Sequence, residues 1–144
     1  MSDSTGVRIF FNYAWPCAEI MLAQGEIAER QYGLLKYFRD NLHRQPGRRL
    51  LVECFPDATR SLLESATIFR ASDPWALEHV REYWRYHHEG PSPTTVLTVE
   101  SMGVDRIWVR ENDGHTGILL NPYSLHVESG DRVTVHHRCA IEKL

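Results

Sequence analysis

Apolar and polar positions alternate near the start of the chain, in the stretch VRIFFN. Val7, Ile9 and Phe11 fall on one face of an extended backbone, and the opposite face is only partly polar. This period of two predicts a short strand with a place in the interior of a sheet. Residues 1–6 before it are polar and are expected to form a flexible N-terminus.

The alternation gives way to a helical period around Pro16. Proline suits the first turn of a helix, because that turn leaves its N–H groups unpaired and proline has none. Apolar residues then recur at three-, four- and seven-residue steps as far as Phe38, which predicts a helical region. Glycine weakens a helix, so the pattern fits either one helix or two helices broken at Gln24-Gly25.

The following segments extend this order of elements. A loop at 41–49 leads into the apolar stretch LLVECF (50–55), which fits a second strand. A strand, a helix and a strand in this order predict a β-α-β unit with its two strands parallel. Apolar spacing then predicts two more helices, one at 58–70 and one from Pro74 to His88.

Beyond the break at GPSP the period changes from helical to alternating. Four strands are expected, at 95–101, 106–110, 116–120 and 132–137. Turn signals such as Asn112-Asp113-Gly114 separate neighbouring strands, which predicts antiparallel pairing in a meander.

These elements predict an α/β fold, with α+β as the alternative, in a single domain of residues 1–144. An N-terminal β-α-β-α-α half precedes the C-terminal antiparallel meander, and both would share one mixed sheet with helices on at least one face. A length of 144 residues is near the commonest domain size. The one candidate boundary between domains is the proline-rich segment at 90–94.

Composition and charge narrow the classes of function. A hydrophobic fraction of 42% and a charged fraction of 24% are those of an ordinary globular domain. A net charge of −3 offers no general attraction for nucleic acid or an anionic membrane, so neither is an expected partner. There is no signal-peptide pattern, and no apolar run reaches the roughly 18 residues that span a bilayer. The three cysteines lack paired spacing, which favours reduced thiols and a cytoplasmic location.

Cys17 is the candidate nucleophile. It follows Pro16 in the predicted first helical turn, where unpaired N–H groups stabilise a thiolate. The stretch IFFNYAWPC resembles the active-site entry of thioredoxin-like proteins, although the second cysteine of a C-x-x-C pair is absent. Any redox role would therefore use one cysteine. A thiol-dependent enzyme would also need a base, for which His115 and His126 are the candidates. The alternative is that Cys17 is a packed, inert thiol.

The eight histidines include the doublets His87-His88 and His136-His137. Neighbouring side chains point apart on a regular helix or strand, so neither doublet is expected to chelate a metal ion by itself. Surface or hydrogen-bonded histidines are therefore expected, without a metal or another cofactor.

The aromatic segment WALEHVREYWRYHH, which begins at Trp75, is a candidate contact surface. Trp, Tyr and Arg dominate binding hot spots, and several of these rings fall away from the apolar stripe of the predicted helix. We expect Trp75, Tyr83, Tyr86 and His87 to contact a partner protein or a second copy of the chain. The alternative is that Trp75 and Trp84 pack in the core while the polar residues are solvated.

Arg44, Arg48 and Arg49 flank Pro46-Gly47 in the predicted loop. Guanidinium groups are well suited to hold a phosphate or a carboxylate. Arginines in a loop are, however, more often simply solvated.

Three functions are compatible with the sequence. The leading one is a non-catalytic binding protein or accessory subunit that acts through protein–protein contacts, because no complete catalytic set is visible. The second is the thiol-dependent enzyme or redox protein that uses Cys17. The third is a small-ligand or metal sensor built on the C-terminal β region. In that region ILLNPYSLHVESGDRVTV resembles the terminal hairpin of ligand-sensing domains attached to potassium transport proteins, and equally resembles pieces of cofactor-binding barrels.

Overall fold

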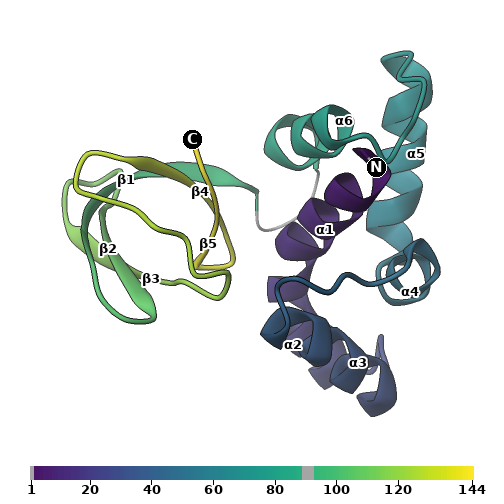
Figure 1. Cartoon of the computed structure of the whole chain (residues 1–144), viewed down its shortest axis with the longest axis horizontal. Coiled ribbons are helices and arrows are strands. Elements are labelled where there is room, and N and C mark those ends of the chain that lie inside the picture. Colours follow the sequence, from purple (N-terminus) through teal and green to yellow (C-terminus); the bar gives the residue numbers. More distant parts are fainter. Residues whose placement is uncertain (1, 89–92) are drawn as a thin grey trace. The chain divides into compact units, whose positions relative to one another are not determined.

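The chain forms two compact units, residues 1–88 and residues 89–144, in a computed structural model that describes residues 2–88 and 93–144 (Figure 1). The first unit is built of helices and the second is a β-barrel. Helices and a mixed sheet are both present, which confirms the predicted α/β class. The boundary lies beside the predicted seam at 90–94, of which residues 90–92 lie outside the described residues. That the two units make one domain stays a prediction.

The helical unit contains six α-helices, one 3-10 turn (η1) and one π-helical turn (η2) among its described residues. In chain order they are α1 (Ser2–Ala14), η1 (Trp15–Cys17), α2 (Ala18–Ala23), α3 (Glu29–Asp40), α4 (Arg48–Cys54), α5 (Pro56–Ile68), α6 (Leu77–Glu82) and η2 (Tyr83–His87). The two-helix interpretation of the region after Pro16 is confirmed, since α2 ends before Gly25. At φ 75° that residue adopts the left-handed conformation that commonly ends a helix.

The strand predicted at 7–12 is wrong, because these residues belong to α1. Val7, Phe10, Phe11 and Ala14 are buried at steps of three and four residues, which places them on one face of a helix. A short apolar run is compatible with the period of a helix and with that of a strand. The apolar Phe10 would lie on the outer face of a strand, and this indicates the helical period. Residues 2–6 also belong to α1, which begins at Ser2, and the flexibility of the N-terminus stays a prediction.

The second strand of the expected β-α-β unit, at 50–55, is also wrong. This stretch lies in and just after α4, where Leu51, Cys54 and Phe55 are buried while Val52 is exposed. The burial follows the helical step of three and four residues rather than the alternation of a strand. The described residues of the N-terminal half therefore contribute no strands to the sheet.

The later helices follow the sequence more closely. The helix predicted at 58–70 is α5, which starts two residues earlier with Pro56 in its first turn. The helix predicted from Pro74 starts three residues later, at Leu77. The reason is a turn in which the Asp73 carboxylate accepts a hydrogen bond of 3.0 Å from the Trp75 N–H.

Aromatic rings join α1 to η2 and to the turn before α6 in the core of the helical unit. The ring of Trp84 lies 5.2 Å from that of Phe10 and 5.7 Å from that of Tyr13, and Phe10 also lies 5.1 Å from Trp75. Pairs of this kind add about 0.5–1.5 kcal/mol each beyond the burial of their area. The backbones also approach closely here, since a methyl group on Gly6 would overlap the carbonyl oxygen of Trp75.

The second unit is a closed barrel of five strands. They are β1 (Thr95–Met102), β2 (Arg106–Arg110), β3 (Thr116–Leu120), β4 (Arg132–His136) and β5 (Cys139–Lys143), in the order β1-β2-β3-β5-β4. The four predicted strands are present, and β5 was not predicted. Strands β1 to β3 form the expected meander. Its continuation into the fourth predicted strand is wrong, because β4 returns to pair with β1, which makes a Greek key.

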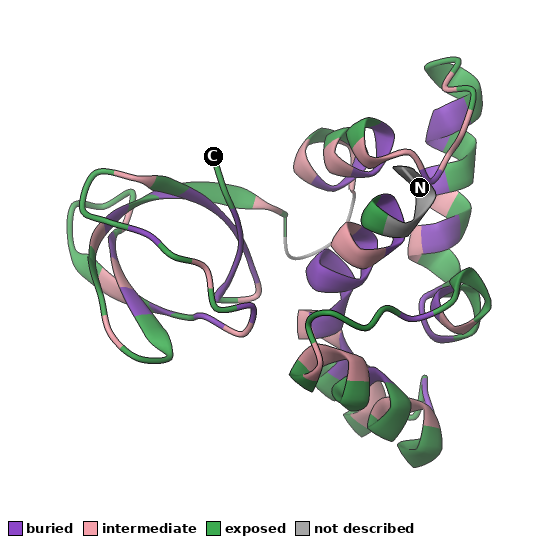
Figure 2. Cartoon of the chain, viewed as in Figure 1, coloured by how far each residue is buried: buried purple, intermediate pink, exposed green. Residues whose placement is uncertain are grey.

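Apolar side chains fill the barrel. Burial alternates with exposure along the first three strands, so one face of each points inward (Figure 2). The buried cluster consists of Leu97, Val99, Ile107, Val109, Leu119, Val127, Val133, Val135 and Ala140.

The seam between β3 and β5 closes the barrel with very little pairing. These strands are parallel and share a single register pair, Leu120 with Cys139. The Leu120 N–H donates to the Arg138 carbonyl at 2.9 Å, and the Arg138 guanidinium donates to the Ile118 carbonyl at 2.9 Å. A side chain thus supplies a hydrogen bond where the backbone ladder is short.

Candidate functional site

The aromatic segment after Trp75 is mostly core. Trp75, Tyr83 and Trp84 are buried, so the expectation that Trp75 and Tyr83 face a partner is wrong, and the packing of Trp75 and Trp84 in the core is confirmed. The reason is that α1 packs on α6 while α5 packs on η2. The segment that contains α6 and η2 therefore buries a wider face than a helix that packs on one neighbour.

Two of the predicted contact residues do reach the surface. Tyr86 is 77% exposed, and the ring of His87 stacks on the exposed ring of Phe69 with centroids 4.4 Å apart. Ile68, next to Phe69, is exposed as well. We call Ile68, Phe69, Tyr86 and His87 the aromatic tip. The partner role of Tyr86 and His87 stays a prediction.

Cys17 is a half-buried thiol at the junction of η1 and α2. The strand expected before it is absent, because α1 runs directly into η1, and α2 is only six residues long. The strand-to-helix geometry behind the thioredoxin-like resemblance is therefore missing. The catalytic role of Cys17 stays a prediction.

The two candidate bases belong to the barrel unit. His115 is exposed in the turn between β2 and β3, with its Nδ1 atom 3.3 Å from the Asp113 carboxylate. His126 is exposed in the connection between β3 and β4. Their catalytic roles also stay predictions.

The three candidate anion-binding arginines do not share one loop. Arg48 and Arg49 begin α4, so their placement in a loop is wrong. The guanidinium of Arg48 lies over the Trp75 ring at 5.6 Å, and that of Arg49 is 3.1 Å from the Glu53 carboxylate. Arg44 is exposed in the loop before α4. Two of the three groups are therefore directed at other protein side chains, and anion binding stays a prediction.

A serine and a histidine meet in the helical core, and because they are 14 positions apart no local pattern indicates the contact. His79 Nε2 lies 3.0 Å from Ser65 Oγ and 3.1 Å from the Leu62 carbonyl oxygen, and both side chains are buried. A carbonyl only accepts, so Nε2 carries the proton of that bond. The Nε2 atom of His79 is then a hydrogen-bond donor to Ser65 rather than a base. The contact links α5 to α6.

The outer face of β2 and β3 carries adjoining apolar side chains, which we call the barrel patch: Trp108, Ile118 and Leu120. Trp108 pairs with Ile118 in register, and Leu120 is the diagonal neighbour of Trp108. Ile118 is 46% exposed and Leu120 is 51% exposed. The Trp108 ring is held against Gly103, where an added Cβ would lie only 2.7 Å from its Cζ3 atom.

Positive charge flanks the barrel patch. Arg106 and Arg110 lie two residues to either side of Trp108, so they share its outward face. The contact of Arg106 with Asp105 is long, at 3.9 Å, and Arg110 has no ion pair in the part of the chain that the structure describes. The alternation in RIWVR was the available signal, since it puts two arginines and a tryptophan on one face.

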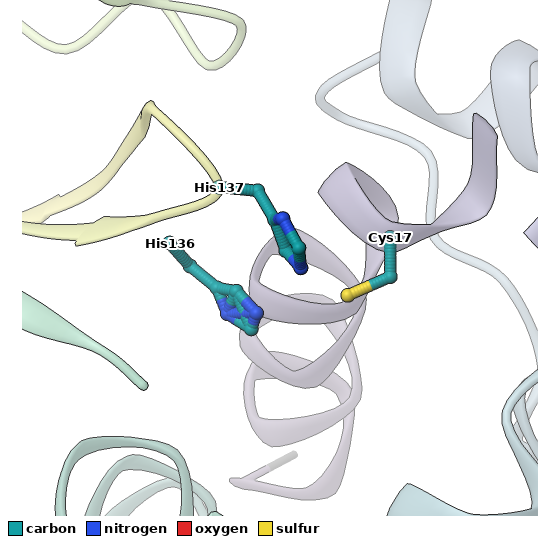
Figure 3. Close-up of side chains that lie close together, drawn as sticks. All are labelled: Cys17, His136 and His137. Atoms are coloured by element: carbon teal, nitrogen blue, oxygen red, sulfur yellow. The ribbon is translucent and has the colours of Figure 1, made fainter. Parts of the chain in front are cut away.

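The side chains of His136 and His137 do not point apart as predicted. The ring centroids are 4.7 Å apart, although adjacent side chains on a strand point to opposite faces (Figure 3). The expectation fails because His137 is not in a strand. It lies in the turn between β4 and β5, at φ 49°. Figure 3 also labels Cys17, a residue of the helical unit.

No helix in the described part of the chain has both the length and the apolar character needed to cross a membrane. No protein-family model, curated protein or solved structure matches the chain.

Proposed function

We propose that this protein is a non-catalytic binding protein or accessory subunit, and that the barrel patch is its contact surface. The observation that carries the proposal is the set of adjoining apolar side chains on the outer face of β2 and β3, where Ile118 and Leu120 are about half exposed. Exposed apolar residues scattered singly need no explanation, whereas adjoining ones mark contact sites.

The energetics favour such a contact. Covering the exposed halves of Ile118 and Leu120 would contribute about 1 kcal/mol each, from the usual gain per area of apolar surface. Trp108 belongs to the residue types that most often carry binding energy. Because Gly103 supports its ring, little side-chain entropy remains to be lost on binding.

The rim of the patch indicates the chemistry of the partner. Arg106 and Arg110 supply positive charge beside the apolar centre, and a guanidinium pairs best with a carboxylate. The partner that fits is a protein segment that presents apolar side chains next to Asp or Glu. Nucleic acid fits less well, because the whole chain carries a net charge of −3.

A displayed library of random peptides, selected on the purified full-length chain, tests this proposal. The expected result is enrichment of peptides that combine carboxylates with apolar residues. Their affinity should fall at least tenfold for Ile118→Glu, because this change puts a carboxylate in the middle of the patch. Arg110→Glu should weaken the same peptides and reduce the dependence of their binding on salt.

Tyr86→Ala is the matched control, since Tyr86 is an exposed aromatic residue of the aromatic tip. The assignment fails if the selected peptides bind Ile118→Glu as tightly as the original chain, or if Tyr86→Ala alone removes binding. Sedimentation of the original chain and of Ile118→Glu tests whether the patch binds a second copy of the chain instead of a foreign protein. A dimer that the variant dissociates would replace the foreign partner with a second copy of the chain.

A further inference from the structure

The turn between β4 and β5 has an unusual composition for its backbone. It consists of His137 and Arg138, both in the left-handed region at φ 49° and 63°, and it joins the paired residues His136 and Cys139. Two-residue hairpin turns of this kind usually hold Asn, Asp or Gly. Other residues with side chains cost about 1–2 kcal/mol each in this conformation.

This backbone brings two imidazoles together. The rings of His136 and His137 are inclined at 33°, and a ring nitrogen of one lies within 4.8 Å of a ring nitrogen of the other. At a metal–nitrogen distance of about 2.0–2.1 Å, two nitrogens on one tetrahedral ion lie roughly 3.3 Å apart. Ligation of one ion therefore requires the two nitrogens to approach each other.

The side-chain chemistry of the pair suits a transition-metal ion. Imidazole nitrogen is a preferred ligand for zinc, copper and nickel ions, whereas calcium and magnesium prefer oxygen.

We propose that His136 and His137 form a two-imidazole site for a divalent transition-metal ion, with Zn²⁺ as the ion that fits best. The two rings supply two ligands from one hairpin, and water or a further donor completes the coordination. This site shares no residue with the barrel patch, so it neither requires nor follows from the proposed contact function.

Titration calorimetry of Zn²⁺ into the full-length chain tests the site, with His137→Asn as the decisive variant. Asparagine removes the imidazole, yet it adopts the left-handed turn more readily than histidine does. We expect one Zn²⁺ per hairpin in the original chain and an affinity at least tenfold lower in His137→Asn. His136→Gln removes the other imidazole and should lose affinity to the same extent.

The exposed His115 and His126 provide matched controls. His115→Asn and His126→Asn should bind Zn²⁺ at the hairpin as the original chain does. If His137→Asn binds as tightly as the original chain, or if the controls lose as much affinity, the ion is held adventitiously by surface histidines and the site is refuted.

Thermal unfolding separates loss of the site from loss of the fold. Zn²⁺ should raise the Tm of the original chain, because a ligand that binds only the folded state stabilises it. Without metal, His137→Asn should unfold at the same temperature or higher, and added Zn²⁺ should not shift its Tm. A zinc-induced rise in Tm that persists in this variant would also overturn the proposal.

Discussion

Gly6→Ala offers a quantitative test of how α1 packs against the start of α6. Alanine is favoured over glycine in a helix interior by about 1 kcal/mol, so the change would stabilise an isolated helix. Here the new methyl group would overlap the Trp75 carbonyl oxygen and lie 3.2 Å from the Leu77 nitrogen. These are backbone atoms that cannot rotate away, so α1 has to move.

The expected net effect is a loss of stability. Overpacking against backbone belongs near the upper end of its usual range, about 3 kcal/mol, and loosening the contact of Phe10 with Trp75 adds about 1 kcal/mol. Subtracting the gain in helix propensity leaves a net destabilisation of about 3 kcal/mol. For a unit of this size, that lowers the Tm by more than about 10 °C.

Gly33→Ala is the matched control, since Gly33 lies inside α3 and an added Cβ there meets no atom within 4 Å. This variant should gain about 0.5–1 kcal/mol. Urea unfolding followed by far-ultraviolet circular dichroism compares both variants with the original chain. If Gly6→Ala proves as stabilising as Gly33→Ala, the close approach of the two backbones is wrong.

Three further predictions concern single side chains. Burial raises the pKa of Cys54 to about 11, so its thiol should resist alkylation at neutral pH until the chain unfolds; fast labelling mapped by mass spectrometry would contradict this. The pKa of Asp131 is lowered, chiefly by a hydrogen bond from the Glu128 N–H. Stability from this carboxylate is therefore present above its ordinary pKa and lost as pH falls below it, and acid titration of unfolding should be shallower in Asp131→Asn. His79→Leu should cost about 1–2 kcal/mol in urea unfolding, because the hydrogen bond to Ser65 disappears; unchanged stability would mean that this hydrogen bond contributes nothing.

The fold could be predicted from the sequence where the turn residues and the spacing of apolar residues indicate the same element. Residues 106–110 and 116–120 alternate cleanly and flank a turn signal, and both strands have the expected bounds. Residues 7–12 and 50–55 are short apolar runs that fit either period, and packing against other helices decided between them. The return of β4 to β1 depends on long-range pairing, which local sequence does not encode.

The sites were less predictable because they depend on which face of an element is covered. The sequence predicts Trp75 as a contact residue, yet neighbouring helices bury it, while Trp108, which is not predicted, lies in an exposed apolar patch. The histidine doublet shows a second limit. Side-chain directions were inferred from a regular strand, and the left-handed backbone of His137 reverses that inference.

In the short seam between β3 and β5, the guanidinium of Arg138 supplies one of the few hydrogen bonds that close the barrel. Without the guanidinium of Arg138, the Ile118 carbonyl loses its donor and β3 acquires the unpaired margin of an edge strand. That margin adjoins the barrel patch, so any loosening of the seam would add backbone hydrogen-bonding groups to the surface that meets a partner. The seam at which the barrel opens with the smallest loss of hydrogen bonds and the surface proposed to bind a partner thus both include residues 116–120.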